Sequence, residues 1–562
     1  MAHIITQSCC NDATCVSVCP VNCIHPTPGE PDFATAEMLY IDPDVCIDCG
    51  ACVAPCPVSA IYPDYELPSA FTDYEELNAT YFVNRDNAKP AVPRLVARRA
   101  WDDGTELLRV AVVGAGPSAF YAAEELLTQT GLKVEVDMFE RLPVAGGLVR
   151  YGVAPDHQAT KGVLNSFSET MRRPGFRLLA NVEVGRDVSH AQLATRYHAV
   201  VYAVGAMGDR GLGIPGESLA GCHSATAFVS WYNGHPDFAT QEFDLSCPRV
   251  AIVGNGNVAL DVARILTTDI DHLRKTDISD NALAALAASK VEEVVIIGRR
   301  SPAEAAFTTP EFMGLVAAPG VSVVVSPDEV DLNRERSGHA ARSSPGQLKA
   351  ELLARHSRRE PGSGRRVTFK FLRTPVEVLG RERVAGIRLG CNDLVSEDRA
   401  MVARPTGRTE DLEGGMVLRA VGYRADPLPQ LPYDRHNSTL PNDQGRVVDP
   451  STGQPLSGVY ATGWIKRGPS GVIGTNKQCA KETVACLLDD FADARLPRPA
   501  EEEDVAALLP QAVNAEGARV IDAHERAAGR AGFRPRVKVL QLDEMIRVAS
   551  TVAPTPGPGR SR

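Results

Sequence analysis

The pattern of hydrophobic and polar positions predicts the same strand–helix–strand order twice in the middle of the chain. Residues 107–113 are a continuous apolar run, which is typical of a parallel strand buried on both faces. A helical pattern over residues 122–127 and an apolar strand over 134–139 follow it. Strands over 249–253 and 291–297 flank a second helix in the same order. This order predicts two α/β units, each with a parallel sheet.

Periodicity is weaker elsewhere. Residues 66–105 gather Pro, Asn, Asp and Tyr, which predicts a linker. Residues 267–290 are polar and then alanine-rich, which predicts an inserted helix. Residues 501–550 show helical patterning, and the Pro- and Gly-rich residues 551–562 are expected to be disordered.

Length and charge divide the chain further. A chain of 562 residues is too long for one hydrophobic core, and its length predicts three or four domains. Residues 1–84 contain twelve Asp or Glu and no Lys or Arg, so the net charge of −11 belongs to this part. The charge either serves solubility or docks this part on a basic surface, of the same chain or of a partner. Nucleic-acid binding is disfavoured here, because phosphate recognition needs a basic patch.

No apolar run is long enough to span a bilayer, and the N-terminus lacks the pattern of a signal peptide. Nine of the 14 cysteines lie within the first 56 residues, which is typical of ligands rather than of a disulfide framework. A cytoplasmic protein is therefore expected.

One cysteine run carries specific chemistry. Cys46, Cys49, Cys52 and Cys56, followed by Pro57, fit C-x2-C-x2-C-x3-C-P, the run of bacterial iron–sulfur ferredoxins. Steps of three residues turn three thiolates toward one point, while the fourth reaches a different cluster. Structural zinc is the alternative, but zinc sites usually take two separated C-x2-C pairs. The run therefore predicts electron transfer.

A second run lies upstream with one position changed. Cys9, Cys15 and Cys19 keep the frame, and Asp12 stands where the middle thiolate is expected. The crossed pattern predicts a [4Fe-4S] cluster on Cys19, Cys46, Cys49 and Cys52, and another cluster on Cys9, Cys15 and Cys56.

The second cluster has only three regular thiolates, which favours a [3Fe-4S] form. A [4Fe-4S] form with Asp12 or Cys10 as the fourth, weaker ligand stays open. Cys10 and Cys23 lie outside the frame, so non-ligating thiols near a cluster are the preferred interpretation of both.

Each α/β unit contains a dinucleotide fingerprint. The loop from Gly114 to Ala119 follows the first strand: Gly114 makes the tight turn, Gly116 lets a pyrophosphate approach, Ser118 lies in the loop, and Ala119 lets helix and strand pack closely. Glu140 ends the next strand, where it can accept hydrogen bonds from a ribose hydroxyl.

The second fingerprint, at Gly254, Asn255, Gly256, Asn257, Val258 and Ala259, has a different ending. Its next strand leads to Arg299 and Arg300, and two guanidiniums suit the 2′-phosphate of NADPH. Arginines after a strand are also common on protein surfaces. An acid after the first fingerprint and two arginines after the second predict FAD followed by NADPH.

Several strings carry a specific resemblance, namely "GAGPSAFYAAEELL", "GGLVRYGVAPDH", "VGNGNVALDVARIL", "GRRSPAEAAFTTPE" and "GWIKRGPSGVIGTNK". With them, residues 107 to about 550 resemble the adrenodoxin-reductase family of ferredoxin–NADP reductases. Together with the cysteine runs, the whole chain resembles the actinobacterial ferredoxin/ferredoxin–NADP reductase fusions.

The resemblance implies an α+β ferredoxin-like domain with two clusters, followed by an α/β flavoprotein with two Rossmann-type dinucleotide-binding domains. The implied domains are ferredoxin 1–65 (motifs at about 1–30 and 37–66), linker 66–105, FAD-binding 106–208 and 421–550, NADP-binding 209–420, and tail 551–562.

The resemblance also implies site residues. On the FAD side these are Leu148, Val184, Trp464, Gly471, Val472 and Ile473, together with Glu140; on the NADPH side they are Arg210, Asn255 to Val258, Arg299, Arg300 and Glu311. His157 matches the family histidine beside the flavin, although a core histidine is an alternative. Gly314 replaces the acidic residue that typically partners this histidine, which leaves His157 or water alone for a proton relay.

The implied activity is ferredoxin–NADP reductase. Electrons would move between NADPH and the clusters through FAD, and on to an external ferredoxin or haem monooxygenase. Two alternatives stay open: an electron-input subunit of a larger complex, like the small subunit of glutamate synthase, and a non-catalytic electron-carrier module.

Overall fold

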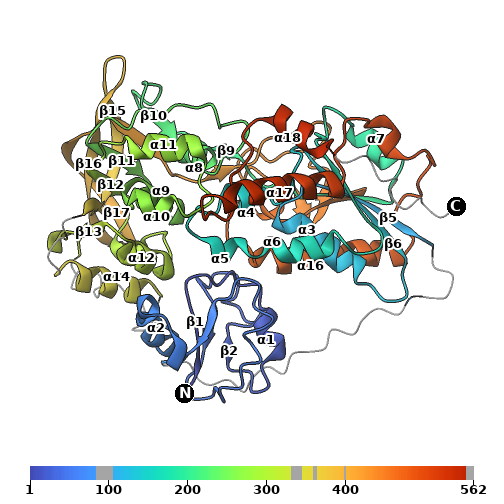
Figure 1. The fold of residues 1–562 in the computed structure, drawn as a ribbon, viewed down its shortest axis with the longest axis horizontal. Coiled ribbons are helices and arrows are strands. Elements are labelled where there is room, and N and C mark those ends of the chain that lie inside the picture. Colours follow the sequence, from blue (N-terminus) through green and yellow to red (C-terminus); the bar gives the residue numbers. More distant parts are fainter. Residues whose placement is uncertain are drawn as a thin grey trace.

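The chain folds into three lobes in the computed structural model, which describes residues 1–83, 101, 106–330, 345–358, 362, 364–397 and 400–551. An N-terminal lobe lies against two larger lobes, each built on its own sheet (Figure 1). The predicted linker from residue 84 onward, apart from Trp101, and the predicted tail from residue 552 onward lie outside the described residues.

The N-terminal lobe, residues 1–83, is built on two short antiparallel pairs, β1 with β4 and β2 with β3. Its elements are β1 (His3–Ile5), α1 (Thr14–Val18), β2 (Ile24–His25), β3 (Tyr40–Ile41), β4 (Ile61–Pro63), the 3-10 turns η1 (Asp64–Glu66) and η2 (Ser69–Phe71), and α2 (Asp73–Phe82).

The prediction of a linker from residue 66 is wrong over its first part, because α2 is folded onto the two strand pairs. The buried amide of Asn78 accepts hydrogen bonds from the backbone N–H groups of Ile5 and Ile41, at 3.3 and 3.0 Å. Tyr81 stacks on Tyr40 with ring centroids 4.1 Å apart. A helix that completes the buried hydrogen bonds of both pairs belongs to this lobe.

A seven-stranded lobe draws on two separated parts of the chain. Its sheet has the order β20-β21-β22-β8-β5-β6-β7, parallel from β22 to β7. The elements are β5 (Leu108–Val113), α3 (Pro117–Leu127), β6 (Val134–Glu140), α4 (Gly147–Tyr151), α5 (Gln158–Lys161), α6 (Leu164–Thr170), β7 (Phe176–Ala180), α7 (His190–Ala194), β8 (Ala199–Tyr202), β20 (Asn442–Asp443), β21 (Arg446–Val448), β22 (Pro455–Ala461), α15 (Trp464–Arg467), α16 (Thr475–Ala492), η5 (Val505–Leu508), α17 (Ala515–Arg530) and α18 (Leu542–Ala549).

A six-stranded lobe lies between those two parts in sequence. Its parallel sheet has the order β10-β18-β11-β12-β14-β13, and an antiparallel sheet β15-β16-β17 accompanies it. The elements are β9 (Gly208–Asp209), β10 (Cys222–Ser224), α8 (Ala225–Tyr232), β11 (Arg249–Val253), α9 (Asn257–Thr267), α10 (Ile270–Leu273), α11 (Asp280–Ala287), β12 (Glu293–Ile297), η3 (Pro302–Glu304), α12 (Thr309–Ala317), β13 (Val321–Val325), η4 (Pro327–Glu329), α14 (Pro345–His356), β14 (Arg365–Lys370), β15 (Arg373–Gly380), β16 (Val384–Glu397), β17 (Ala400–Glu413), β18 (Met416–Arg419) and β19 (Tyr423–Arg424).

The four strands predicted in the two α/β units are confirmed as β5, β6, β11 and β12. Their side chains are buried along most of their length, which explains the continuous apolar runs. The segment 267–290 differs from its prediction, because two short helices, α10 and α11, replace the single inserted helix.

A buried charge cluster joins the two larger lobes. The carboxylate of Asp277, between α10 and α11, accepts a hydrogen bond from Lys161 of α5 at 2.7 Å and lies 3.0 Å from Lys538, beyond α17. Burial alone would raise the pKa of Asp277, but the two ammonium groups lower it well below its usual range. Burial also lowers the pKa of both lysines, since one carboxylate cannot fully offset two buried ammonium groups.

We expect this cluster to make the protein acid-labile. A carboxylate with a depressed pKa stabilises the fold above its unfolded pKa of about 3.9, and this contribution is lost as the pH falls below it. Asp277→Asn should therefore lower the free energy of unfolding by about 3–5 kcal/mol at neutral pH. It should also make this free energy depend less steeply on pH under acid conditions. Urea unfolding at a series of pH values measures both effects.

The neighbouring variant Asp280→Asn is the matched control, because Asp280 pairs with Arg534 while more than half exposed and should cost less than about 1 kcal/mol. If the free energy of unfolding falls equally steeply at acid pH in wild type and in Asp277→Asn, this role of Asp277 is contradicted.

Candidate functional site

A cavity of about 1530 Å³ runs between the seven-stranded and six-stranded lobes. Both fingerprint loops line it, at Gly114 to Ser118 and at Gly254 to Val258, and so do Gln7, Cys9 and Cys10 of the N-terminal lobe. Single-ligand pockets usually occupy roughly 300–1,000 Å³, so this space suits two dinucleotides end to end.

The end within the seven-stranded lobe has the features that a flavin dinucleotide requires. Glu140, at the end of β6, accepts backbone hydrogen bonds from Ala115 at 2.9 Å and from Leu142 at 3.0 Å. Burial raises the pKa of its carboxyl, and these backbone bonds oppose the rise. The two bonds fix the carboxylate beside the fingerprint loop, where a ribose would lie.

The end within the six-stranded lobe has the features that suit NADPH. The fingerprint loop leads into α9, and the amide oxygen of Asn257 accepts a 2.8 Å hydrogen bond from the backbone of Thr308. Arg299 and Arg300 line the cavity just after β12 with exposed side chains, and Arg300 lies 3.6 Å from Glu304. Two exposed guanidiniums in the lining of the cavity suit the recognition of a phosphate.

Most of the residues predicted for the site come together in this cavity. They are His157, Gly114, Gly116, Ser118, Glu140, Leu148, Val184, Asn255, Gly256, Asn257, Val258, Arg299, Arg300, Glu311, Trp464, Gly471, Val472 and Ile473.

Two predicted residues do not line the cavity. Ala119 is fully buried behind the loop, where its small side chain serves packing. The side chain of Arg210 is exposed outside the cavity, and the following Gly211 and Leu212 line it instead.

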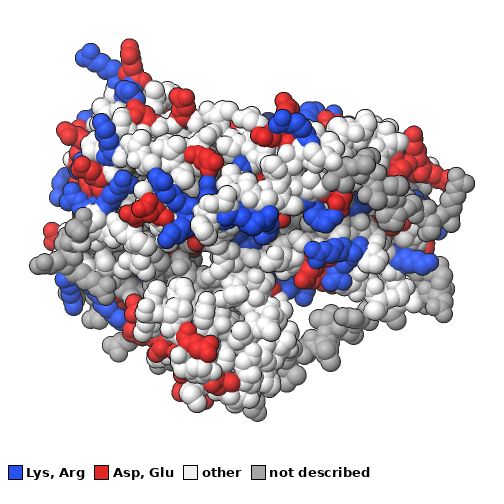
Figure 2. Space-filling model, in the orientation of Figure 1, with Lys and Arg blue, Asp and Glu red and all other residues white. Residues whose placement is uncertain are grey.

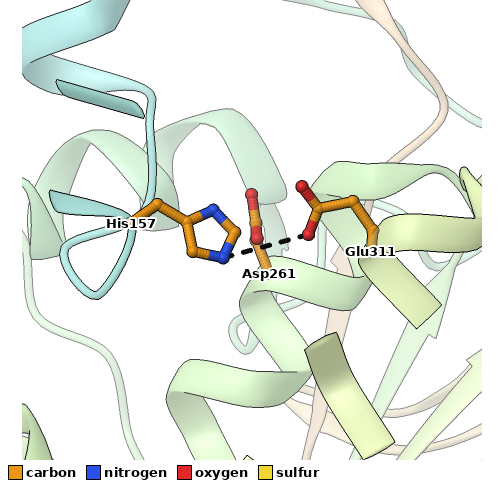
Figure 3. A group of neighbouring side chains, drawn as sticks. All are labelled: His157, Asp261 and Glu311. Carbon is orange, nitrogen blue, oxygen red and sulfur yellow. Dashed lines mark ion pairs between the residues drawn. The ribbon is translucent and has the colours of Figure 1, made fainter. Parts of the chain in front are cut away.

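His157, Asp261 and Glu311 line the cavity and point toward one another from three elements: the loop before α5, α9 and α12 (Figure 3). His157 Nε2 lies 4.0 Å from Glu311 Oε2. Burial raises the pKa of Asp261; the charge of Arg264 opposes the rise and that of Glu311 adds to it. Gly314 supplies no acidic partner for His157, but Glu311, one helical turn earlier on the same face of α12, lies within 4.0 Å of it.

The cysteines of the N-terminal lobe form two groups. Cys19, Cys46, Cys49 and Cys52 line one small cavity together with Cys23, whose sulfur is 3.5 Å from that of Cys19. Burial raises the pKa of the Cys9 thiol to about 12, and the nearby charges of Cys56 and Asp12 contribute. Burial also raises the pKa of the Cys15 thiol, and the nearby charges of Cys9 and Cys56 add to this rise.

The spacing of these sulfurs suits clusters better than a single ion. Among the residues that the structure describes, only His157, Asp261 and Glu311 bring three ligand-type atoms within 4.8 Å of one another. A tetrahedral zinc ion at about 2.3 Å from each sulfur would hold its thiolates closer than that. An iron–sulfur cluster separates its thiolates more widely.

The side chain of Asp12 has hydrogen-bond and ion-pair partners within the chain. Its carboxylate accepts hydrogen bonds from the backbone and hydroxyl of Thr14, and it lies 3.4 Å from Lys477 Nζ of α16. A carboxylate held by an ammonium and a hydroxyl is a weak candidate for an iron ligand.

The acidic N-terminal lobe docks on basic residues of the same chain, which favours docking over solubility as the role of its charge. Figure 2 shows acidic but no basic side chains on this lobe, whereas both kinds lie on the larger lobes. Its interface contacts include Glu37 with Lys349 (3.2 Å), Asp12 with Lys477 (3.4 Å), Glu76 with Arg355 (3.1 Å), Tyr74 with the Pro310 carbonyl (3.2 Å), and the Cys10 carbonyl with the Gly474 N–H (2.6 Å).

Sequence reasoning missed Gln7, Gly474 and Lys477, because only the docked arrangement shows their neighbours. The sequence does contain a signal for Asp261 as a functional residue, because it is a carboxylate within the apolar stretch of α9.

Comparisons with known proteins agree with this geometry. Residues 108–313 match the family model "Pyridine nucleotide-disulphide oxidoreductase", and residues 39–62 match "4Fe-4S binding domain". A "Probable ferredoxin/ferredoxin--NADP reductase" of Mycobacterium tuberculosis is 46% identical over 575 residues, covering 99% of this chain and 96% of the relative. The chain belongs to the ferredoxin/ferredoxin–NADP reductase family.

Members of this family are oxidoreductases, and shorter relatives match the two larger lobes. The structure of Mycobacterium tuberculosis FprA in complex with NADPH has a TM-score of 0.74 and 45% identity, covering 79% of this chain and all of FprA. The mitochondrial NADPH:adrenodoxin oxidoreductase of Salvelinus fontinalis is 41% identical, covering 78% of this chain and 91% of that protein. The predicted fold, a ferredoxin-like lobe before a two-dinucleotide flavoprotein, is thereby confirmed. Within the described parts of the chain, no helix combines the length and apolarity needed to cross a membrane.

Proposed function

We propose that this chain moves electrons between NADPH and an external acceptor through an internal series of FAD and two iron–sulfur clusters. The observation that carries the proposal is the shared cavity, which Cys9 and Cys10 line together with the residues of both fingerprints. When bound, FAD accepts a hydride from NADPH and releases its electrons singly, as clusters require.

The protein residues supply position. The fingerprint loop and Glu140 would hold the FAD diphosphate and ribose, while Trp464 and the segment Gly471 to Ile473 would enclose the flavin ring. Asn255 to Val258, with Arg299 and Arg300, would hold NADPH so that its nicotinamide points toward His157 and Glu311.

The two clusters have different neighbours, which gives the series an order. The cluster on Cys9, Cys15 and Cys56 lies on the reductase side, since Cys9 and Cys10 line the shared cavity. The cluster on Cys19, Cys46, Cys49 and Cys52 has its own cavity, and Cys49 is exposed. Cys9, Cys15 and Cys56 would thus hold the cluster nearer the flavin, and Cys19, Cys46, Cys49 and Cys52 the cluster nearer the surface, an order that would let electrons pass outward.

The exit side fits a protein partner. Val45, Ile47 and Val53, beside the outer cysteines, are 40%, 59% and 38% exposed. The lobe that carries them has no Lys or Arg. We infer that the acceptor, an external ferredoxin or a haem monooxygenase, presents an apolar contact within a basic rim.

The inner cluster is proposed to hold three irons, because Lys477 and Thr14 engage Asp12. Three ferric ions carry an odd number of electrons, so the oxidised cluster should give an EPR signal, whereas an oxidised [4Fe-4S] cluster has an even number. Asp12→Cys supplies the missing thiolate and should abolish most of this signal while the iron content rises. Asp12→Asn should keep the signal, and its loss in that variant would contradict the assignment.

The proposal is tested by adding NADPH anaerobically to the purified chain and following the flavin absorption. Bleaching by NADPH is the expected result. An unbleached flavin would favour the non-catalytic carrier module, and bleaching that needs a second subunit would favour the input subunit of a larger complex.

A further inference from the structure

Helix α12 carries a glycine at an unexpected place. Gly314 lies in the interior of the helix, where glycine is less favourable than alanine. A Cβ atom at this position would lie 2.1 Å from Nε2 and 2.7 Å from Cδ of Gln7. The glycine therefore opens the space that a side chain of the N-terminal lobe occupies.

The Gln7 amide enters this space and reaches the centre of the cavity. Its Nε2 lies 3.4 Å from His157 Nε2 and 3.5 Å from Glu311 Oε2. An amide nitrogen carries two protons and can donate one to each acceptor. Gln7 thus bridges the two groups, which are themselves 4.0 Å apart.

The same helix is a main docking element of the N-terminal lobe. The Glu37 carboxylate accepts a 2.7 Å hydrogen bond from the backbone of Thr309, at the start of α12, and Tyr74 donates to the Pro310 carbonyl. These contacts fix α12 relative to β1, so the position of Gln7 depends on docking. The bridge exists only when the lobe is in place.

We propose that Gln7 is a positioning residue of the reductase site, supplied by the fused ferredoxin. It holds His157 and Glu311 in the arrangement that receives the nicotinamide, so hydride transfer is fastest when the electron acceptor is docked. This inference rests on the proposed function.

Two variants remove the bridge by different routes. Gln7→Met keeps the volume of the side chain and removes its donor. Gly314→Ala leaves Gln7 unchanged but fills its space, and alanine favours the helix, so the melting temperature should not fall. The readout is the rate of flavin reduction in single turnovers of the full chain, measured against NADPH concentration.

Each variant should lower the limiting rate about fivefold, the effect of one hydrogen bond, with little change in the half-saturating NADPH concentration. The double variant should be no slower than either single variant, because both remove the same contact. Arg355→Ala is the control for docking in general: it breaks an exposed pair with Glu76 at the same interface and should leave the rate unchanged.

Unchanged rates in both variants would overturn the inference, and so would additive effects in the double variant. A further loss on adding Arg355→Ala to Gln7→Met would also overturn it, since docking would then affect the rate without the bridge. A wild-type chain that NADPH does not bleach would instead overturn the proposed function.

Discussion

Replacing Gly474 with alanine should disconnect the clusters from the flavin. Gly474 lies at the start of α16, and its N–H donates to the Cys10 carbonyl at 2.6 Å. A Cβ there would lie 2.1–2.2 Å from backbone atoms of Asn11 and Asp12. Backbone atoms cannot turn aside, so the N-terminal lobe must move away from the cavity.

We expect Gly474→Ala to slow cluster reduction by on the order of tenfold or more, since small displacements of reacting groups are costly. Flavin bleaching by NADPH should slow by no more than about fivefold, the loss expected when the Gln7 bridge is broken. Stopped-flow absorbance, which follows the flavin and cluster bands separately, measures both. Gly29→Ala is the matched control, because nothing lies within 4 Å of the added Cβ. Equal loss of flavin and cluster reduction would contradict this role of Gly474.

Removing both Arg299 and Arg300 should change the choice of nucleotide. Both guanidiniums line the cavity with exposed side chains, and Arg300 lies 3.6 Å from Glu304. A hydrogen bond to a charged group contributes about 1.5–3 kcal/mol, so the double alanine variant should lose roughly 100-fold or more in kcat/KM for NADPH. Steady-state kinetics with NADPH and NADH measure the change.

NADH lacks the 2′-phosphate, so its kcat/KM should stay nearly constant in the double variant. Arg383→Ala is the matched control, because Arg383 pairs with Asp244 outside the cavity. Equal losses for NADPH and NADH would show that the two arginines support the fold or the common part of the nucleotide.

The sequence predicted the elements whose signals are local. Continuous apolar runs located β5 and β11, and cysteine spacing separated the two ligand groups, because a strand buried on both faces and a cluster loop each constrain neighbouring residues.

Contacts between distant segments could not be predicted in this way. Helix α2 was assigned to a linker, because its burial depends on Asn78 meeting two strands that are remote in sequence. In the sequence, Gly314 marks only a missing acid. Its proximity to Gln7, more than 300 residues earlier, arises only in the folded chain.

The central claim is that the flavin and the clusters form one internal path within each chain. Its most direct test is the rate at which NADPH reduces the clusters of the wild-type chain, followed by rapid-freeze EPR over a wide range of protein concentrations. Intramolecular transfer predicts a first-order rate that does not depend on protein concentration. A rate that rises in proportion to protein concentration, or clusters that stay oxidised while the flavin is bleached, would contradict the account.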